Sequence, residues 1–117
     1  MSGPGFLRRW RDAWFARPRR VERDGWSVQV DRGGRAGYVG YAEPPGRLRF
    51  DWEMLAGGIG VRLPTADAWD DECARQGCAW ARGRRDEIVP RIAAEVQRLS
   101  APGSRLVMAS DGFDLLA

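Results

Sequence analysis

The chain has 117 residues, of which 44% are hydrophobic and 30% charged, and its formal net charge is +3. Domains most often contain roughly 100–150 residues, so this length and composition predict one folded domain and exclude a disordered tail. All nineteen basic residues are arginine, because the sequence contains neither lysine nor histidine. A serine or cysteine nucleophile activated by histidine, an imidazole metal ligand and a Schiff-base lysine are therefore excluded within one chain.

The groups that remain for acid–base chemistry are carboxylates, tyrosines and cysteines. The sixteen acidic residues show no recognisable catalytic spacing. Cys73 and Cys78 are separated by four residues and lack the second pair of ligands that a zinc site needs. We therefore expect a protein that is not an enzyme, binds no metal or other cofactor, and keeps both cysteines reduced.

The N-terminal segment is both basic and aromatic. Residues 1–35 contain nine arginines and four acids, whereas residues 36–117 contain ten arginines and twelve acids. Apolar residues at helical spacing predict a short helix over residues 6–16, which Pro18 ends. Such a helix suits an anionic membrane surface or a phosphate group. The side chains expected to make those contacts are Arg8, Arg9, Trp10, Arg11 and Trp14.

Nucleic acid is not the expected partner of this basic segment, because no recognisable reader motif accompanies it and the rest of the chain is mildly acidic. No apolar run approaches the roughly 20 residues of a membrane span. The first residues also lack the apolar core of a secretory signal. A cytoplasmic location is therefore expected.

Residues 26–63 alternate apolar and polar side chains, a pattern typical of half-buried antiparallel strands. The alternation predicts four strands, which begin near Trp26, Tyr38, Leu48 and Ile59 and are separated by turns rich in glycine and proline. The third strand is the clearest, because its even positions 48–54 are apolar and its odd positions 49–53 are charged.

The C-terminal half combines helices with a hairpin. Thr65 is expected to cap a helical turn that runs to Trp69, and residues 70–85 fit either an extension of that helix or an ordered loop. Residues 86–99 form an amphipathic helix, in which Pro90 is tolerable only near the start. Two strands around a turn at Asp111-Gly112 complete the chain.

Together these elements predict an α+β fold. We expect an antiparallel sheet, made of a four-stranded meander and a C-terminal hairpin, with one long helix packed on one face and a short N-terminal helix. The chain is expected to form a single domain over residues 1–117. Within it, residues 1–20 form the basic aromatic N-terminal helix and residues 24–117 form the α+β body.

Two charged stretches are candidates for binding a protein partner. The polar face of the third strand remains exposed if the long helix covers the other face, although ion pairing across the sheet to Arg62 would also explain its charges. Its candidate residues are Arg49, Asp51 and Glu53. The second stretch is an acidic run beside large aromatic residues, which are common at binding hot spots. Its candidate residues are Asp70, Asp71 and Glu72.

Three parts of the chain resemble small immunity proteins of bacterial polymorphic toxin systems. They are the strand pair over residues 46–63, the turn Ala68-Trp69-Asp70 and the helix that starts with residues 85–92. The resemblance covers roughly residues 26–110 and rests on strand order and spacing. It implies a cytoplasmic non-enzyme that binds and blocks one cognate toxin domain. The N-terminal segment and the insertion at residues 70–85 depart from the pattern, so no functional residue is carried over.

The leading hypothesis is therefore a non-enzymatic protein-binding module that inhibits a partner, with a toxin domain as the partner that the resemblance implies. The alternative is an accessory protein of the membrane surface, anchored by residues 6–20. A paired-carboxylate enzyme is the third hypothesis, and it would require a deep pocket that holds two acids, one of them with a strongly raised pKa.

Overall fold

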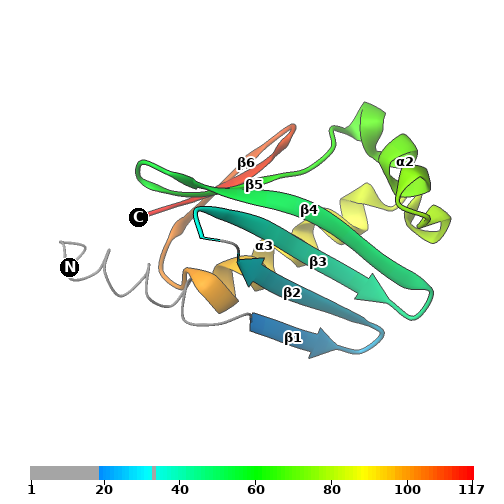
Figure 1. Ribbon diagram of the computed structural model, residues 1–117, viewed down its shortest axis with the longest axis horizontal. Coiled ribbons are helices and arrows are strands. Elements are labelled where there is room, and N and C mark those ends of the chain that lie inside the picture. Colours follow the sequence, from blue (N-terminus) through cyan, green and yellow to red (C-terminus); the bar gives the residue numbers. More distant parts are fainter. Residues whose placement is uncertain (1–18, 33) are drawn as a thin grey trace.

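The computed structural model describes residues 19–32 and 34–117, which form one seven-stranded antiparallel sheet with two α-helices (Figure 1). The predicted α+β class is thus confirmed. The strands are β1 (Arg19–Arg23), β2 (Trp26–Arg32), β3 (Ala36–Glu43), β4 (Gly46–Leu55), β5 (Gly58–Arg62), β6 (Arg105–Ala109) and β7 (Gly112–Leu116). The helices are α2 (Ala66–Arg75), the short 3-10 helix η1 (Ala79–Ala81) and α3 (Arg85–Ser100).

The strand order is β1-β2-β3-β4-β5-β7-β6, and each neighbouring pair is antiparallel. The meander therefore contains five strands rather than the predicted four. The C-terminal hairpin belongs to the same sheet, because β7 pairs with β5 along the whole of both strands. The predicted N-terminal helix over residues 6–16 lies outside the described residues.

β1 was not predicted, because four of its five residues are charged and it shows no apolar alternation. Its only apolar residue, Val21, lies opposite Val28 of β2. Arg23 donates two hydrogen bonds of 2.9 Å to the buried carboxylate of Glu95 on α3. Strand pairing and this ion pair therefore place the segment in the sheet. Residues 19 and 20, expected in the N-terminal helix, are strand residues instead.

The hydrophobic core lies between α3 and one face of the sheet. In Figure 1, α3 passes behind the strands, so the face turned toward the viewer is the polar one. The apolar stripe of α3 is buried, as its periodicity predicts. Its buried apolar residues are Ile88, Val89, Ile92, Ala93 and Val96. Pro90 is the sixth residue of α3, so it lies one turn further into the helix than the tolerated start positions.

α2 accounts for part of residues 70–85, for which the sequence allowed either a helix extension or an ordered loop. The helix continues past Trp69 to Arg75, and η1 follows after a turn. Thr65 occupies the position before the helix, but its side chain makes no capping hydrogen bond. Trp69 is buried, stacks on Phe50 at 5.7 Å between ring centroids and donates a 2.9 Å hydrogen bond to the Ala81 carbonyl. These contacts hold α2 and η1 against the sheet.

The β6–β7 hairpin turn differs by one position from the prediction. Ala109 pairs with Gly112, so the two turn residues are Ser110 and Asp111. Gly112 instead lies in β7 with φ of 142°, where a Cβ would be 2.0 Å from the carbonyl oxygen of Val61. The glycine is therefore required by the close approach of β5 rather than by the turn.

Candidate functional site

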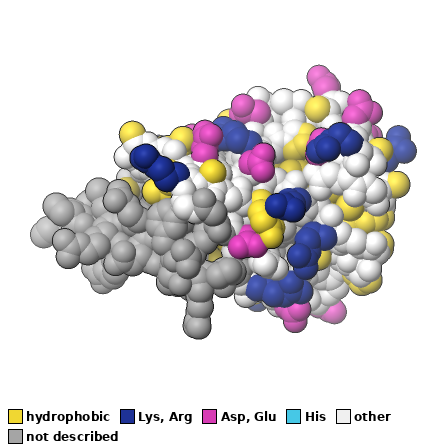
Figure 2. Space-filling view, viewed as in Figure 1, with side chains coloured by type: hydrophobic (Ala, Val, Ile, Leu, Met, Phe, Trp, Pro, Cys, Tyr) yellow, Lys and Arg dark blue, Asp and Glu magenta, His cyan; other side chains and the backbone are white. Residues whose placement is uncertain are grey.

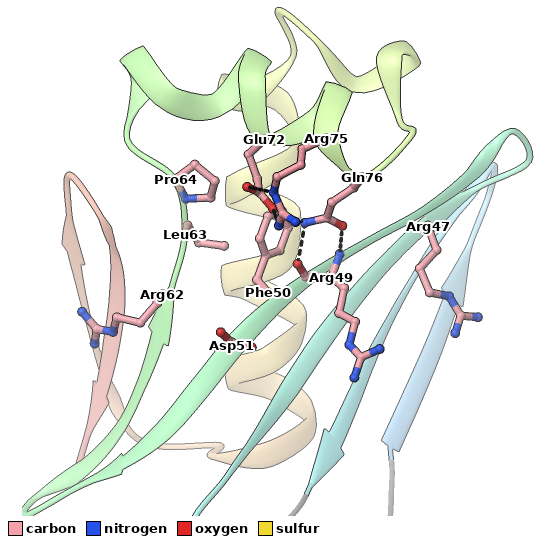
Figure 3. Close-up of a pocket in the computed structure, with 10 residues that line it drawn as sticks. All are labelled: Arg47, Arg49, Phe50, Asp51, Arg62, Leu63, Pro64, Glu72, Arg75 and Gln76. Carbon is pink, nitrogen blue, oxygen red and sulfur yellow. Dashed lines mark hydrogen bonds and ion pairs between the residues drawn. The ribbon is translucent and has the colours of Figure 1, made fainter.

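A notch opens where β5 separates from β4. The two strands pair from Asp51 and Arg62 to Leu55 and Gly58, so the first half of β4 has no strand on that side. The chain leaves the sheet after Arg62 and returns as α2, which encloses a cavity of about 710 Å³ (Figure 3). We call this cavity the notch. It is lined by Arg47, Arg49, Phe50, Asp51, Arg62, Leu63, Pro64, Glu72, Arg75 and Gln76.

The side chain of Gln76 closes the open edge of β4. Its Oε1 accepts a hydrogen bond from the main-chain N–H of Arg49, and its Nε2 donates one to the Arg49 carbonyl, both at 2.8 Å. One amide group thereby reproduces the pair of bonds that a neighbouring strand would make. The Cys78 thiol also lies 3.1 Å from the Arg47 carbonyl. The end of α2 and the loop after it therefore stand in for a strand.

Half of the charged side chains that line the notch are held in ion pairs. Arg75 pairs with Glu72, whose Oε2 also accepts a 2.7 Å hydrogen bond from Gln76. Hydrogen bonds from Arg75 and Gln76 lower the pKa of the Glu72 carboxyl. Arg62 pairs with Asp114 of β7 at 2.6 Å, although Asp51 lies directly opposite it in the strand register. The predicted ion pair between Arg62 and the third-strand acids is therefore replaced by one to the next strand.

The arginines of β4 rest on the polar sheet face. The Arg49 guanidinium lies 3.7 Å from the centre of the Tyr38 ring, a cation–π contact that holds it in place. The aliphatic part of Arg47 lies over Gly40, whose Cβ position would be 3.6 Å from Arg47 Cδ. Figure 2 views this face and shows arginine and acidic side chains interspersed over it. The face thus offers both signs of charge to a partner.

The notch brings together three of the six predicted partner-binding residues: Arg49, Asp51 and Glu72. Glu53 lies on the same face of β4 but further along the strand, opposite Gly60. Asp70 and Asp71 are exposed on α2 and do not line the notch. The two candidate stretches therefore meet at the part of β4 that β5 leaves unpaired.

The five acids among these six residues divide into two groups by what they contact. Asp70 accepts a 2.8 Å hydrogen bond from the main chain of Gly83, and Glu72 holds Gln76, so both support the local structure. Asp51, Glu53 and Asp71 are exposed and make no side-chain hydrogen bond or ion pair with any described residue. These three acids are available to bind a partner.

Three polar residues of the notch were not singled out from the sequence: Arg47, Arg75 and Gln76. The alternation of β4 already placed Arg47 beside Arg49 on the polar face, so that position carried a usable signal. The sequence around Gln76 contained no such signal, because its hydrogen-bond partner Arg49 is 27 positions away in the chain.

A second cluster of charges fixes α3 to β3. The buried Tyr41 donates a 2.5 Å hydrogen bond to Glu43 and accepts one of 2.8 Å from Arg91. Arg84 donates two more hydrogen bonds to Glu43, at 3.0 and 2.8 Å. Burial, followed by the bond to Glu43, raises the pKa of Tyr41 to about 12. The partners of these groups are supplied within the chain, so the cluster is structural.

The described part of the chain contains no group of three or more acidic or cysteine side chains placed to hold a metal ion. Cys73 and Cys78 are both free and buried. Within residues 19–32 and 34–117, no helix has the length and apolar character needed to cross a bilayer. The predicted membrane-contact residues lie outside this part of the chain; they are Arg8, Arg9, Trp10, Arg11 and Trp14.

No protein-family model, curated protein or solved structure matches this chain significantly. Its function must therefore be inferred from its own residues and geometry.

Proposed function

We propose that this chain is a non-enzymatic protein-binding module, which docks its partner on the notch and the adjoining surface of α2. The observation that carries the proposal is the meeting of the two charged stretches at one cavity, with Asp51 and Glu72 on opposite walls. The shape of this cavity is maintained by the Gln76 and Trp69 hydrogen bonds. A preformed concave surface of this kind loses little conformational entropy when it binds a partner.

The unpaired charges indicate the chemistry of the partner. Asp51, Glu53 and Asp71 favour basic groups on the contacting surface, and the exposed Arg47 of the notch favours an acidic group beside them. Complementary charges of this kind accelerate encounter and fix the register of docking. Arg49 is suited to be an anchor because the Tyr38 ring already holds its guanidinium, and arginine is enriched at hot spots. The resemblance to immunity proteins supports a bacterial toxin domain as that partner, which the module would inhibit in the cytoplasm.

The test is affinity capture from lysate of the source cells with matched variants. The bait is the full chain, either wild type or the double variant Asp51→Asn with Asp71→Arg. The matched control is Asp24→Arg, at the exposed β1–β2 turn. Washing at about 0.5 M salt screens long-range attraction, so only docked proteins remain. We expect one stoichiometric partner with the wild type and the control, and at least tenfold weaker binding to the double variant.

Equal binding of this partner to all three baits would contradict the proposed docking surface. Circular dichroism and thermal unfolding of each bait separate lost binding from lost folding. Inhibition of an activity of the captured partner would support the immunity role, and unchanged activity would contradict it.

The alternative, an accessory protein of the membrane surface, is tested by removing residues 1–18. The deletion stops before Arg19, because β1 begins there and a longer deletion would disrupt the sheet. Binding of the full chain to anionic vesicles that is lost in the truncated chain would favour this alternative. Equal or absent vesicle binding by both chains would contradict a membrane anchor in residues 1–18.

A further inference from the structure

Among the described residues, β6 is an edge strand whose outer main-chain groups are open. The main-chain N–H of Leu63 donates to the Asp111 carbonyl, and that of Ala117 donates to the Gly57 carbonyl. Residues 111 and 117 flank β7, so its odd-numbered residues turn their main-chain groups toward β5. The even-numbered ones therefore bond to β6, where their register partners are Arg105, Val107 and Ala109. The N–H and C=O groups of Leu106 and Met108 consequently face away from the sheet.

The two edges of the sheet differ in their protection. At β1, four of five residues are charged, which discourages pairing with another strand. At β6, only Arg105 is charged. Met108 is 49% exposed and is the one large hydrophobic side chain exposed among the described residues. An edge with so few charges is a template for an added strand.

We propose that two copies of this chain associate by antiparallel pairing of β6 with β6. The open groups favour one register, because only the pairing of Leu106 with Met108 of the second copy uses both open residues of each strand. The twofold axis then passes beside Val107, which lies opposite its own counterpart. Four main-chain hydrogen bonds form, two on each side of the axis.

The side chains fit this register. Leu106 and Met108 lie opposite Leu115 and Phe113 of β7, so they are on the core face of the sheet. In the dimer, each exposed Met108 is covered by Leu106 of the second copy, and the two cores become continuous across the axis. Removal of this apolar surface from water favours association.

Charge complementarity identifies a second copy as the occupant of the edge. Arg105 lies opposite Ala109 of the second copy, and Asp111, in the turn that follows β6, comes two positions later. Both side chains are exposed, and neither has an ion-pair partner among the described residues. A long arginine side chain reaches such a diagonal neighbour, so one attractive pair forms at each end of the interface. A five-residue strand gives a small interface, and the dimer is therefore expected to be weak.

Sedimentation velocity of the full chain between about 10 μM and about 1 mM tests the proposal, since this range covers weak association. Val107→Lys and Val107→Glu each place like charges face to face at the axis, and should raise the dissociation constant at least tenfold. An equimolar mixture of the two variants should dimerise again, because lysine then faces glutamate. Ala36→Lys is the matched control, at an exposed position on β3 away from this edge.

A second pair of variants guards against a folding defect at Val107. Arg105→Asp and Asp111→Arg should each weaken association alone and restore it when combined in one chain. The proposal is overturned if the wild type stays monomeric over the whole range. It is also overturned if the Val107 variants associate as the wild type does, or if their mixture gains no dimer over the separate variants.

Discussion

The substitution Gln76→Glu tests whether one side-chain amide replaces a strand at the edge of β4. It preserves size and shape, and a carboxylate can still accept the hydrogen bond from the Arg49 N–H. The second carboxylate oxygen, however, faces the Arg49 carbonyl and the Glu72 carboxylate, to which the wild-type amide donates at 2.8 and 2.7 Å. Two attractive contacts therefore become repulsive.

The expected loss follows from these two contacts. A neutral hydrogen bond contributes about 1 kcal/mol and one to a charged group about 1.5–3 kcal/mol. Gln76 is half-buried, and water satisfies part of what is lost. We therefore expect the free energy of unfolding to fall by about 2 kcal/mol at pH 7. In a domain of this size, that corresponds to a decrease of about 8 °C in the unfolding temperature.

The pH dependence provides a sharper test. The introduced carboxyl faces a carbonyl and a carboxylate, so its pKa in the folded protein should rise above the ordinary 4.5, whereas the pKa of Glu72 is lowered. A raised pKa in the folded state favours folding at low pH. The loss in free energy of unfolding relative to the wild type should therefore be greatest at pH 7. It should shrink toward pH 4.5, where the introduced carboxyl is protonated and can donate a hydrogen bond.

Urea unfolding at both pH values measures these differences. Gln29→Glu is the matched control, because its side-chain oxygen only accepts from Arg20, at 3.4 Å, and a carboxylate does the same. Its effect should be below about 0.5 kcal/mol. If Gln76→Glu costs no more than this control at pH 7, the amide does not hold the edge of β4.

Two further predictions concern buried groups. Burial tends to raise the pKa of Glu43, but the hydrogen bonds from Arg84 and Tyr41 outweigh burial and lower the pKa. The ionised Glu43 therefore stabilises the fold at neutral pH, and this stabilisation is lost as the pH falls and the carboxylate is protonated. Glu43→Gln should therefore lower stability at pH 7 and flatten its decline between about pH 5 and 3, as urea unfolding would show; an unchanged decline would contradict this role. Burial raises the pKa of Cys73 to about 11 and also raises the pKa of Cys78. A thiol reagent at about pH 8 should therefore label the folded chain slowly and the urea-unfolded chain completely. Fast labelling without urea would show that the α2–η1 segment opens.

Periodicity along the chain was sufficient to predict β2 to β5 and α3. In these elements, every second or every third to fourth residue is apolar, and burial of that face stabilises the same structure that the pattern indicates. The polar face of β4 was predictable for the same reason, and with it Arg49 and Asp51 as candidate binding residues.

Only the tertiary structure decided which elements lie beside each other. β1 has no apolar pattern and becomes a strand by pairing with β2 and with Glu95 of α3. The notch exists because β5 leaves β4 at Arg62, and because Gln76 returns to the open edge. Such contacts join residues distant in the chain, so no local pattern records them. The sequence determined which surfaces carry charge, and the fold determined which of these charges meet.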